Sequence, residues 1–237
     1  MLLQLESTCA DCHEDFRCFL SAEPPPLSYM RNIPESLLQT CVKIANEAPK
    51  DLKSNLRRAW MKVDPTSLQR CSPSQPFKAC TFALCVYHAL ILGRRRFGCQ
   101  GWSTPYSFNS GDLEVCLKVL FAHIEGQKNI PWEEIRYIVG DIMYGGHITD
   151  YWDRRTNATY LVDIFKKSLL RGGDILPKFA SPVAGKFDYA KYTDYIEKKL
   201  PAETAQLFGL NPNAEVCLAL LSLAHSTHGC MHVKIVM

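Results

Sequence analysis

The residues best able to hold a haem or an exchangeable disulfide are Cys9, Cys12 and His13. Their CxxCH spacing is the pattern in which two thiols attach a haem and the histidine ligates its iron. The two cysteines alone would also suit a redox pair. We expect neither chemistry. Haem attachment requires export, and the apolar stretch Met1–Leu5 is too short for a secretory signal and lacks basic residues.

A second group of potential metal ligands lies near the C-terminus and consists of His225, His228, Cys230 and His232. Imidazole and thiolate groups suit zinc, but structural zinc sites usually pair two close ligands with two distant ones. The N-terminal cysteine pair would be the natural source of the distant ligands. We therefore predict no metal site and keep a zinc or haem protein as an open alternative.

A basic segment from Gly93 to Gly98 approaches the spacing of a phosphate-binding loop. Cys99 and Gln100 stand where that loop needs a lysine and a serine or threonine, so nothing would reach the terminal phosphates or hold Mg²⁺. The segment also follows a predicted helix rather than a strand. The sequence contains no GxSxG or HExxH element. We predict no catalytic, cofactor-binding or metal-binding residues in this chain.

The segment from Tyr144 to Arg155 combines a double-glycine turn with a helix start that carries acids, arginines and a tryptophan. One interpretation is a turn capped by Thr149 or Asp150, followed by ion pairs along the helix surface. The other is a docking surface, because tryptophan and arginine often anchor protein interfaces. The candidate docking residues are Gly145, Gly146, Trp152, Asp153, Arg154 and Arg155.

The composition is that of an ordinary globular protein. The 237 residues include 27 Lys and Arg against 24 Asp and Glu, for a formal charge of +3, and 47% are hydrophobic. This charge is too small and too evenly spread to predict nucleic-acid binding. The length allows one or two domains with a sizeable core. The eleven cysteines are irregularly spaced, so we expect reduced thiols in a reducing compartment.

The most apolar stretch, Phe77–Leu92, is shorter than the roughly 20 residues that a membrane-spanning helix needs. Lys78 and His88 interrupt it, and the arginine run Arg94–Arg96 follows it. We expect a helix buried on most sides within a soluble bundle, with the arginines at its C-terminus, where cations suit the helix dipole. No membrane partner is predicted.

Before this stretch, hydrophobic spacing predicts a strand and two helices. The apolar run Phe16–Leu20 suits one buried strand, which the following prolines end. Pro34 opens a predicted helix that runs to about Asn46, and a second helix is expected over Leu52–Met61. The Pro- and Ser-rich stretch Asp64–Pro76 predicts a linker.

From Phe77 onward the pattern is steadily helical, so the predicted fold is mainly α. Helices are expected over residues 77–95, 113–124, 131–142, 150–170, 189–200 and 214–224, with a loop over 98–109. The buried stripe of the 131–142 helix is predicted to be Trp132, Ile135, Ile138, Val139 and Ile142. That of the 150–170 helix is predicted to be Tyr151, Ala158, Leu161, Val162 and Phe165.

The order of several motifs resembles the C-terminal motor region of dynein heavy chains over roughly residues 13–216. Ordered blocks over that length are far more specific than any short motif, and the Trp152–Arg155 form is more similar to axonemal than to cytoplasmic dyneins. Asp51, Gly93 and His147 depart from the family pattern, and the similarity fades from about Cys217. The resemblance rests on blocks within Phe16–Pro24, Leu38–Leu56, Phe77–Trp102, Pro105–Leu113, Pro131–Arg155 and Phe208–Ala214.

The resemblance implies a fold and a division into domains. Residues 1–66 would be the end of the sixth AAA+ large subdomain, an α/β remnant with a strand and helices. Residues 76–171 would be its helical AAA+ lid. Residues 174–237 would be a truncated C-terminal domain with a divergent tail from about 217. The expected fold class is mainly α, a helical lid bundle flanked by these two partial domains.

The resemblance also implies a function: a non-catalytic, mechanical part of a minus-end-directed microtubule motor subunit for ciliary movement. Its expected partners are neighbouring AAA+ ring modules of the same heavy chain and the dynein intermediate and light chains, with microtubules bound only through other segments. ATP and Mg²⁺ would bind in other modules. The expected location is the cytoplasm, the cytoskeleton and the ciliary axoneme. The alternative is a short, free-standing helical adaptor isoform without motor activity.

Overall fold

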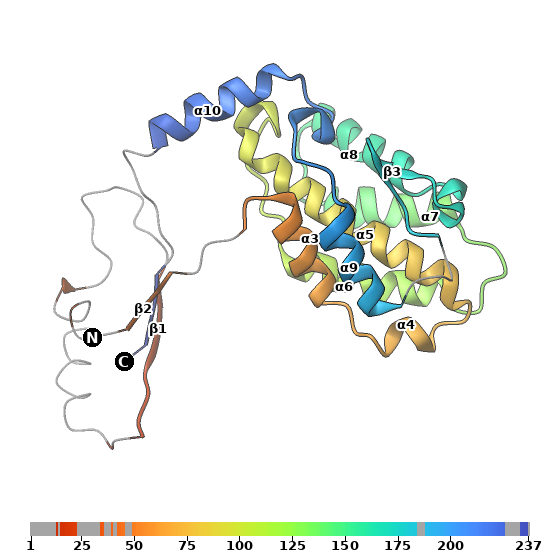
Figure 1. Ribbon diagram of the computed structural model, residues 1–237, viewed down its shortest axis with the longest axis horizontal. Helices are drawn as coiled ribbons and strands as arrows, with labels where there is room; N and C mark the ends of the chain where they lie inside the picture. Colours follow the sequence, from red (N-terminus) through yellow and green to blue (C-terminus); the bar gives the residue numbers. More distant parts are fainter. Residues whose placement is uncertain are drawn as a thin grey trace. The chain divides into compact units, whose positions relative to one another are not determined.

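The chain divides into two units, which are described separately. The computed structural model describes residues 13, 15–22, 34, 35, 39, 42–45, 49–183, 188–225 and 233–236. One unit combines Met1–Pro49 with Leu220–Met237, and the other is Lys50–Ala219. We call them the sheet unit and the helical unit. The predicted class is confirmed, because helices dominate the described residues and strands are few (Figure 1).

The sheet unit contains three short strands, β1 (Phe19–Ala22), β2 (Val42–Ala45) and β5 (Val233–Val236). β5 lies in the middle and pairs antiparallel with both others, with Val236 opposite Phe19 on one side and Val42 on the other. The predicted N-terminal strand is therefore present, with its start shifted from Phe16 to Phe19. Its predicted burial is wrong, because Phe19 is 74% exposed.

The helix predicted from Pro34 to Asn46 is wrong in its second part. Glu35 and Gln39 are helical, but Val42–Ala45 form β2. Val42 and Ile44 are β-branched and suit a pleated strand, and pairing with β5 supplies ladder partners that helical spacing along the sequence cannot reveal. Tertiary pairing overrode the local pattern.

The helical unit is built around α5 (Ser74–Arg94), in which nearly every residue from Phe77 to Arg94 is buried (Figure 1). α3, α4, α6 and α8 pack against it. By length and composition α5 is the one candidate membrane span among the described residues, and 83% of its apolar window is buried inside the protein. The prediction of a buried core helix is confirmed. The other helices of the unit are α3 (Leu52–Met61), α4 (Ser67–Arg70), η1 (Arg95–Gln100), α6 (Ser110–Ile124), α7 (Trp132–Tyr137), η2 (Ile138–Tyr144), α8 (Tyr151–Ile164), η3 (Lys167–Arg171), α9 (Tyr189–Lys199) and η4 (Ala205–Phe208).

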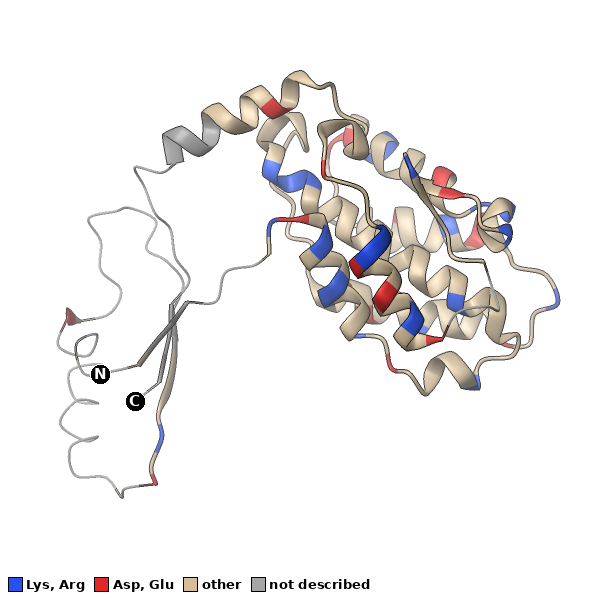
Figure 2. Cartoon of the chain, in the orientation of Figure 1, with Lys and Arg blue, Asp and Glu red and all other residues tan. Residues whose placement is uncertain are grey.

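Two further elements complete the description. A hairpin of β3 (Asp174–Leu176) and β4 (Phe179–Ala180) follows η3. The helix α10 (Asn213–His225) begins in the helical unit and continues past its boundary. Lys and Arg residues are interspersed with Asp and Glu residues along the helices of the helical unit (Figure 2).

Local capping explains where two of the core helices begin. Asp51 caps α3 by accepting a hydrogen bond from the Ser54 amide at 2.8 Å. Asn109 and Asp112 form a reciprocal capping box at the start of α6. Both helices lie close to their predicted ranges.

An aromatic cluster around Trp60 joins early and late parts of the chain. The Trp60 ring lies 5.3 Å from that of Tyr189 and 5.0 Å from that of Tyr192, both on α9. Phe82 of α5 lies 5.0 Å from Tyr192 and 6.2 Å from Phe179. Aromatic pairs at such distances add to the burial of apolar area. Residues after 174 therefore share one core with α3 and α5.

The structure corrects the predicted linker over Asp64–Pro76. This stretch contains α4 and the first residues of α5, and Leu68 and Cys71 are buried in the core. The prolines and serines do break regular structure, but the apolar residues between them pack inward. The stretch is a packed connection rather than an exposed linker.

The predicted stripe on the 131–142 helix is wrong at Ile142, which is 54% exposed. The cause is η2, a π-helical segment whose wider turns shift the buried positions relative to an α-helix. Val139 and Tyr144, five residues apart, are buried. An α-helical period of 3.6 residues does not put these two positions on the same face, so it could not predict that both are buried.

The predicted buried face of α8 is also wrong in part. Tyr151 and Val162 are mostly exposed, and Ala158 is exposed as well. The observed buried positions are Asp153, Asn157, Leu161 and Ile164. The polar residues within this face have specific partners, so a hydrophobic pattern alone could not find it.

Candidate docking surface

The double-glycine turn lies directly after η2 and allows close backbone packing. A Cβ atom added at Gly145 would lie 2.3 Å from the Gly140 carbonyl oxygen and 2.6 Å from that of Asp141. At Gly146 the nearest atom would be the Ile142 oxygen, at 2.9 Å. Gly145 is buried, so its role is to let the chain turn tightly against the π-helix.

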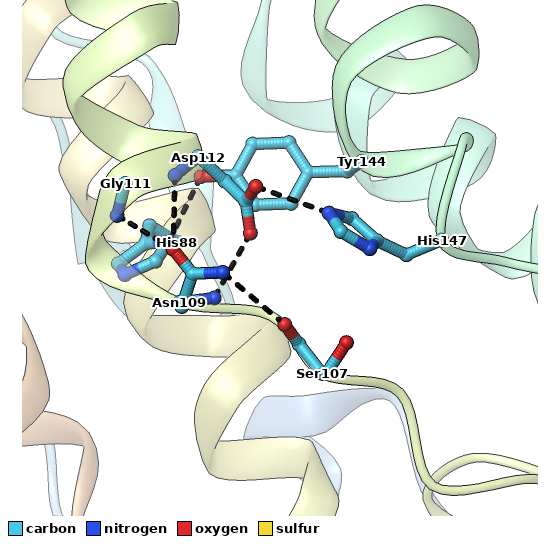
Figure 3. Close-up of polar contacts among 7 residues, drawn as sticks. All are labelled: His88, Ser107, Asn109, Gly111, Asp112, Tyr144 and His147. Atoms are coloured by element: carbon cyan, nitrogen blue, oxygen red, sulfur yellow. Dashed lines mark hydrogen bonds and ion pairs between the residues drawn. The ribbon is translucent and has the colours of Figure 1, made fainter.

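The turn places His147 against the start of α6 (Figure 3). His147 Nε2 lies 3.0 Å from Asp112 Oδ1, and the other carboxylate oxygen of Asp112 accepts the Asn109 amide at 2.9 Å. Behind this pair, His88 Nδ1 and the Tyr144 hydroxyl form a buried hydrogen bond of 2.8 Å. Burial lowers the pKa of His88 to about 4, so this histidine is neutral near pH 7. The cluster ties α5, α6 and η2 together.

Asp150 caps α8, so of the two predicted cap residues, Thr149 and Asp150, the second is observed. Its Oδ1 accepts the amides of Trp152 at 2.8 Å and of Asp153 at 3.0 Å. Arg154 donates from Nε to the Ile148 carbonyl at 2.9 Å. Cap and arginine together fix the direction in which the chain leaves the turn.

Asp153 points into the protein and is 8% exposed. Its Oδ2 accepts hydrogen bonds from the Ser103 amide at 3.0 Å, from the Ser103 hydroxyl, and from the Tyr106 hydroxyl at 2.7 Å. This carboxylate therefore anchors the 98–109 loop to α8. Its position leaves no role for it on the outer surface of the helix.

Trp152 and Arg155 face outward, together with Tyr151. The exposed fractions of Trp152 and Tyr151 are 67% and 65%. The Arg155 guanidinium carbon lies 5.3 Å from the centre of the Trp152 ring and 6.0 Å from that of Tyr151, within cation–π range. We call these three residues the Trp152 surface. Tyr151 was missed as a site residue because its spacing suggested a buried face.

The first interpretation of this segment is right about the cap but wrong about the ion pairs. Within residues 49–183, which the structure describes, no ion pair within 4 Å joins Asp150 or Asp153 to Arg154 or Arg155. The six candidate residues instead divide into two groups. Gly145, Asp153 and Arg154 make internal contacts, and Trp152 and Arg155 form an outward cluster; Gly146 is exposed within the turn.

A buried polar link supports the helix that carries this surface. The Tyr87 hydroxyl donates to the Asn157 side chain, whose Nδ2 donates to the Gly140 carbonyl at 3.0 Å. Gly140 lies in η2, where the π-helical pattern disturbs ordinary backbone pairing. Asn157 lies four residues from Asp153 and four from Leu161, so all three share one helix face. This spacing could have identified Asn157 from the sequence.

Arg94 lies in the last turn of α5, as predicted, but its side chain is buried among specific partners. It is 8% exposed, and its guanidinium lies 5.4 Å from the Trp102 ring centre and 5.5 Å from that of Tyr160. It donates to the Gly101 carbonyl, to the Tyr160 hydroxyl and to the Phe208 carbonyl, the last at 2.7 Å. Arg94 therefore connects the core helix to η4.

The segment Gly93–Gly98 joins α5 to a 3₁₀-helix, whereas a phosphate-binding loop joins a strand to a helix. A Cβ atom at Gly93 would lie 2.7 Å from the Phe208 ring, so this glycine serves close packing. The geometry agrees with the prediction that the segment is not a phosphate loop.

The predicted metal-ligand groups lie mostly outside the described residues. His13 is described and exposed, but Cys9 and Cys12 are not described, and neither are His228, Cys230 and His232. Within the part of the chain that the structure describes, no group of three His, Cys, Asp or Glu side chains could hold a metal ion.

Comparison with known proteins identifies the family. Residues 77–214 match the family model of the dynein heavy chain AAA lid domain. The chain is 42% identical over 214 residues to "Dynein axonemal heavy chain 17" of Homo sapiens and 44% identical over 213 residues to "Dynein axonemal heavy chain 11" of Sus scrofa, covering 90% of this chain in each case. It is 42% identical over 243 residues to "Dynein alpha chain, flagellar outer arm" of Chlamydomonas reinhardtii, covering 91% of this chain. The matches span about 5% of the length of these relatives. The chain belongs to the dynein heavy chain family and carries its AAA lid domain.

Proposed function

We propose that this chain serves as a non-catalytic, mechanical part of an axonemal-type dynein heavy chain, a microtubule motor subunit for ciliary movement. The observation that carries the proposal is the identity of about 42% to axonemal heavy chains over 90% of the chain. The lack of a phosphate-loop sequence at Gly93–Gln100 also supports it. ATP and Mg²⁺ would act in other modules of the motor, and the place of action would be the ciliary axoneme.

The domain roles follow as part of the same proposal. Residues 1–66 would belong to the sixth AAA+ large subdomain, residues 76–171 to the helical lid, and residues 174–237 to the C-terminal domain. The helical unit would transmit rearrangements between ring modules as one body, because its helices share a single core. The motor's intermediate and light chains would be further partners of the whole assembly.

The first test of this proposal is an ATPase assay on the purified chain. We expect no Mg²⁺-dependent hydrolysis above the buffer background, since no lysine stands where a phosphate loop would place it. Phosphate release measured with excess ATP checks this, with an intact phosphate-loop module from a dynein motor as the positive control. Turnover that copurifies with the chain through successive columns would contradict the proposal.

We further propose that the Trp152 surface docks against a neighbouring AAA+ module of the same heavy chain. The changes Trp152→Ala and Arg155→Ala together should weaken that association about 30-fold, as expected for an aromatic and arginine anchor. The free energy of unfolding should change by less than about 0.5 kcal/mol, because both side chains are exposed. Calorimetric titration with the adjacent module, expressed separately, measures the affinity.

The matched control for this prediction lies on α3. Met61 is 70% exposed and Arg58 is exposed, so Arg58→Ala with Met61→Ala removes a similar apolar and cationic surface elsewhere. This control should leave the affinity unchanged. An unchanged affinity for the Trp152 and Arg155 double variant, together with a loss of thermal stability, would show that the cluster only packs on its own helix.

A further inference from the structure

The buried face of α8 is unusually polar. It consists of Asp153, Asn157, Leu161 and Ile164, so two of its four residues are polar. Both polar side chains are hydrogen-bonded inside the protein. A helix at the surface of a globular protein normally buries an apolar stripe and turns its polar residues outward. α8 departs from that arrangement, and several of its apolar residues face solvent.

The apolar residues on the outward face of α8 lie in one line. Tyr151, Arg155, Ala158 and Val162 are all exposed, Val162 over 53% of its surface. Their spacing of four, three and four residues places them one above another along the helix. We call these four residues the outer stripe. At 1.5 Å per residue it is about 17 Å long.

The spacing of the outer stripe indicates which kind of element fits it. Alternate steps of three and four residues form the seam along which two helices pack at a shallow angle. A strand repeats every two residues and does not match this spacing. Ala158 has the smallest side chain of the stripe and lies near its middle, so a partner helix approaches most closely there. The stripe therefore suits a helix that lies lengthwise along α8.

The outer stripe also carries one positive charge, on Arg155. The Arg155 guanidinium lies 5.3 Å from the centre of the Trp152 ring, which holds the side chain beside the stripe. Among the residues that the structure describes, no carboxylate lies within 4 Å of this guanidinium. Asp153 is buried, and Asp150 accepts from amides of its own helix. Arg155 is therefore open to a carboxylate from a partner.

A second copy of this chain would fit the outer stripe less well than a different helix. In a two-fold pair of antiparallel helices, Arg155 of each copy would lie near the middle of the other stripe. The stripe has no carboxylate to offer there, so the two arginines would approach each other. Like charges that face each other across an interface disfavour the pairing.

We propose that the outer stripe binds one amphipathic α-helix of the neighbouring AAA+ module. This helix lies lengthwise along α8 and carries a carboxylate opposite Arg155. The inference rests on the proposed docking of the Trp152 surface and names the element that docks there. The partner helix presents apolar side chains to Tyr151 and Val162 and comes closest at Ala158, and Trp152 forms the edge of the contact.

The first experiment measures the spacing of the contacts on the partner. The photo-crosslinking residue para-benzoylphenylalanine replaces Tyr151 in one variant of the full 237-residue chain and Val162 in another. Each variant is irradiated with the separately expressed adjacent module. A helix along the stripe gives crosslinked partner sites about 11 residues apart, because both helices rise 1.5 Å per residue. A strand would give sites about five residues apart, since it rises 3.3 Å per residue.

Three crosslinking outcomes would overturn the inference. The first is a pair of partner sites with the strand spacing, and the second is a pair of sites in separate segments of the partner. The third is crosslinking between two copies of this chain, which would make the occupant a second copy. Sites with the helical spacing within one segment support it.

The second experiment tests the close approach at Ala158. Ala158→Arg should weaken the association with the adjacent module about tenfold, because the larger side chain blocks the partner helix. Arginine is a good helix former, so thermal unfolding should be unchanged at this exposed position. The matched control, Ala122→Arg, adds the same side chain at an exposed alanine of α6 and should leave the affinity unchanged. Equal affinities of the two variants would contradict the predicted contact.

The third experiment tests for the carboxylate on the partner. Arg155→Gln removes the charge and should weaken the association about fivefold, the scale of a hydrogen bond to a charged group. Arg155→Glu should weaken it about tenfold more, because like charges would then meet. Equal effects of the two substitutions would mean that the partner presents no carboxylate at this point.

The failure of this inference can be told apart from that of the proposed docking. If the adjacent module does not bind the unmodified chain at all, the docking is wrong and this inference falls with it. If the module binds, and Trp152→Ala with Arg155→Ala weakens the binding, the docking stands. Strand spacing of the crosslinks, or an unchanged affinity for Ala158→Arg, would then reject the partner helix alone.

Discussion

Arg94→Ala is expected to lower the free energy of unfolding of the helical unit by about 3 kcal/mol. The guanidinium is buried between two aromatic rings and donates to the oxygens of Gly101, Tyr160 and Phe208. Hydrogen bonds from a charged donor contribute about 1.5–3 kcal/mol each, and truncation takes the Arg94 donor away from the buried Gly101 carbonyl. Urea unfolding followed by circular dichroism measures the loss.

The neighbouring arginine gives a matched control. Arg95 is exposed, so Arg95→Ala should change the stability by less than about 0.5 kcal/mol. Arg94→Lys should lose about half as much as Arg94→Ala, because an ammonium group cannot reproduce the planar fork of donors. Equal effects of Arg94→Ala and Arg95→Ala would show that the buried contacts of Arg94 add nothing to stability.

Gly145→Ala is expected to cost about 2–3 kcal/mol. The added methyl group would approach the backbone oxygens of Gly140 and Asp141 to 2.3 and 2.6 Å, and backbone atoms cannot rotate away as a side chain can. Either η2 rewinds or the turn shifts, and both would disturb the His147–Asp112 contact. The midpoint of thermal unfolding measures the cost.

The adjacent glycine provides a graded comparison for this prediction. At Gly146 the nearest backbone oxygen would lie 2.9 Å from the new Cβ and the residue is exposed, so Gly146→Ala should cost about 1 kcal/mol or less. A cost for Gly146→Ala equal to or larger than that for Gly145→Ala would mean that the close packing at Gly145 does not limit stability.

Much of the helical unit could be predicted from the sequence, because its helices are long and their signals agree. α3 begins and ends at its predicted residues, and α5 was recognised as a buried helix from its apolar composition. The failures have a physical cause in common. β2 depends on pairing with β5, and η2 departs from α-helical geometry. The spacing of apolar residues predicts neither long-range strand pairing nor a local change of helical pitch.

The docking site stays a prediction, and the different roles of its residues could not be separated by sequence. Trp152 and Asp153 are neighbours, and the helix turns one outward and the other into a loop that begins some fifty positions earlier. Arg94 and Arg95 differ in the same way. Side-chain direction decides these roles, and it is set by partners far along the sequence.

The position of α5 has a consequence for how the protein is made. Its covering residues Phe179 and Tyr192 are synthesised long after it, and the Arg94–Phe208 hydrogen bond closes a separation of 114 residues. Until those residues leave the ribosome, a helix apolar enough to cross a membrane has one face without its partner. The nascent chain is therefore most vulnerable to aggregation, and most in need of chaperone protection, between the synthesis of α5 and that of η4.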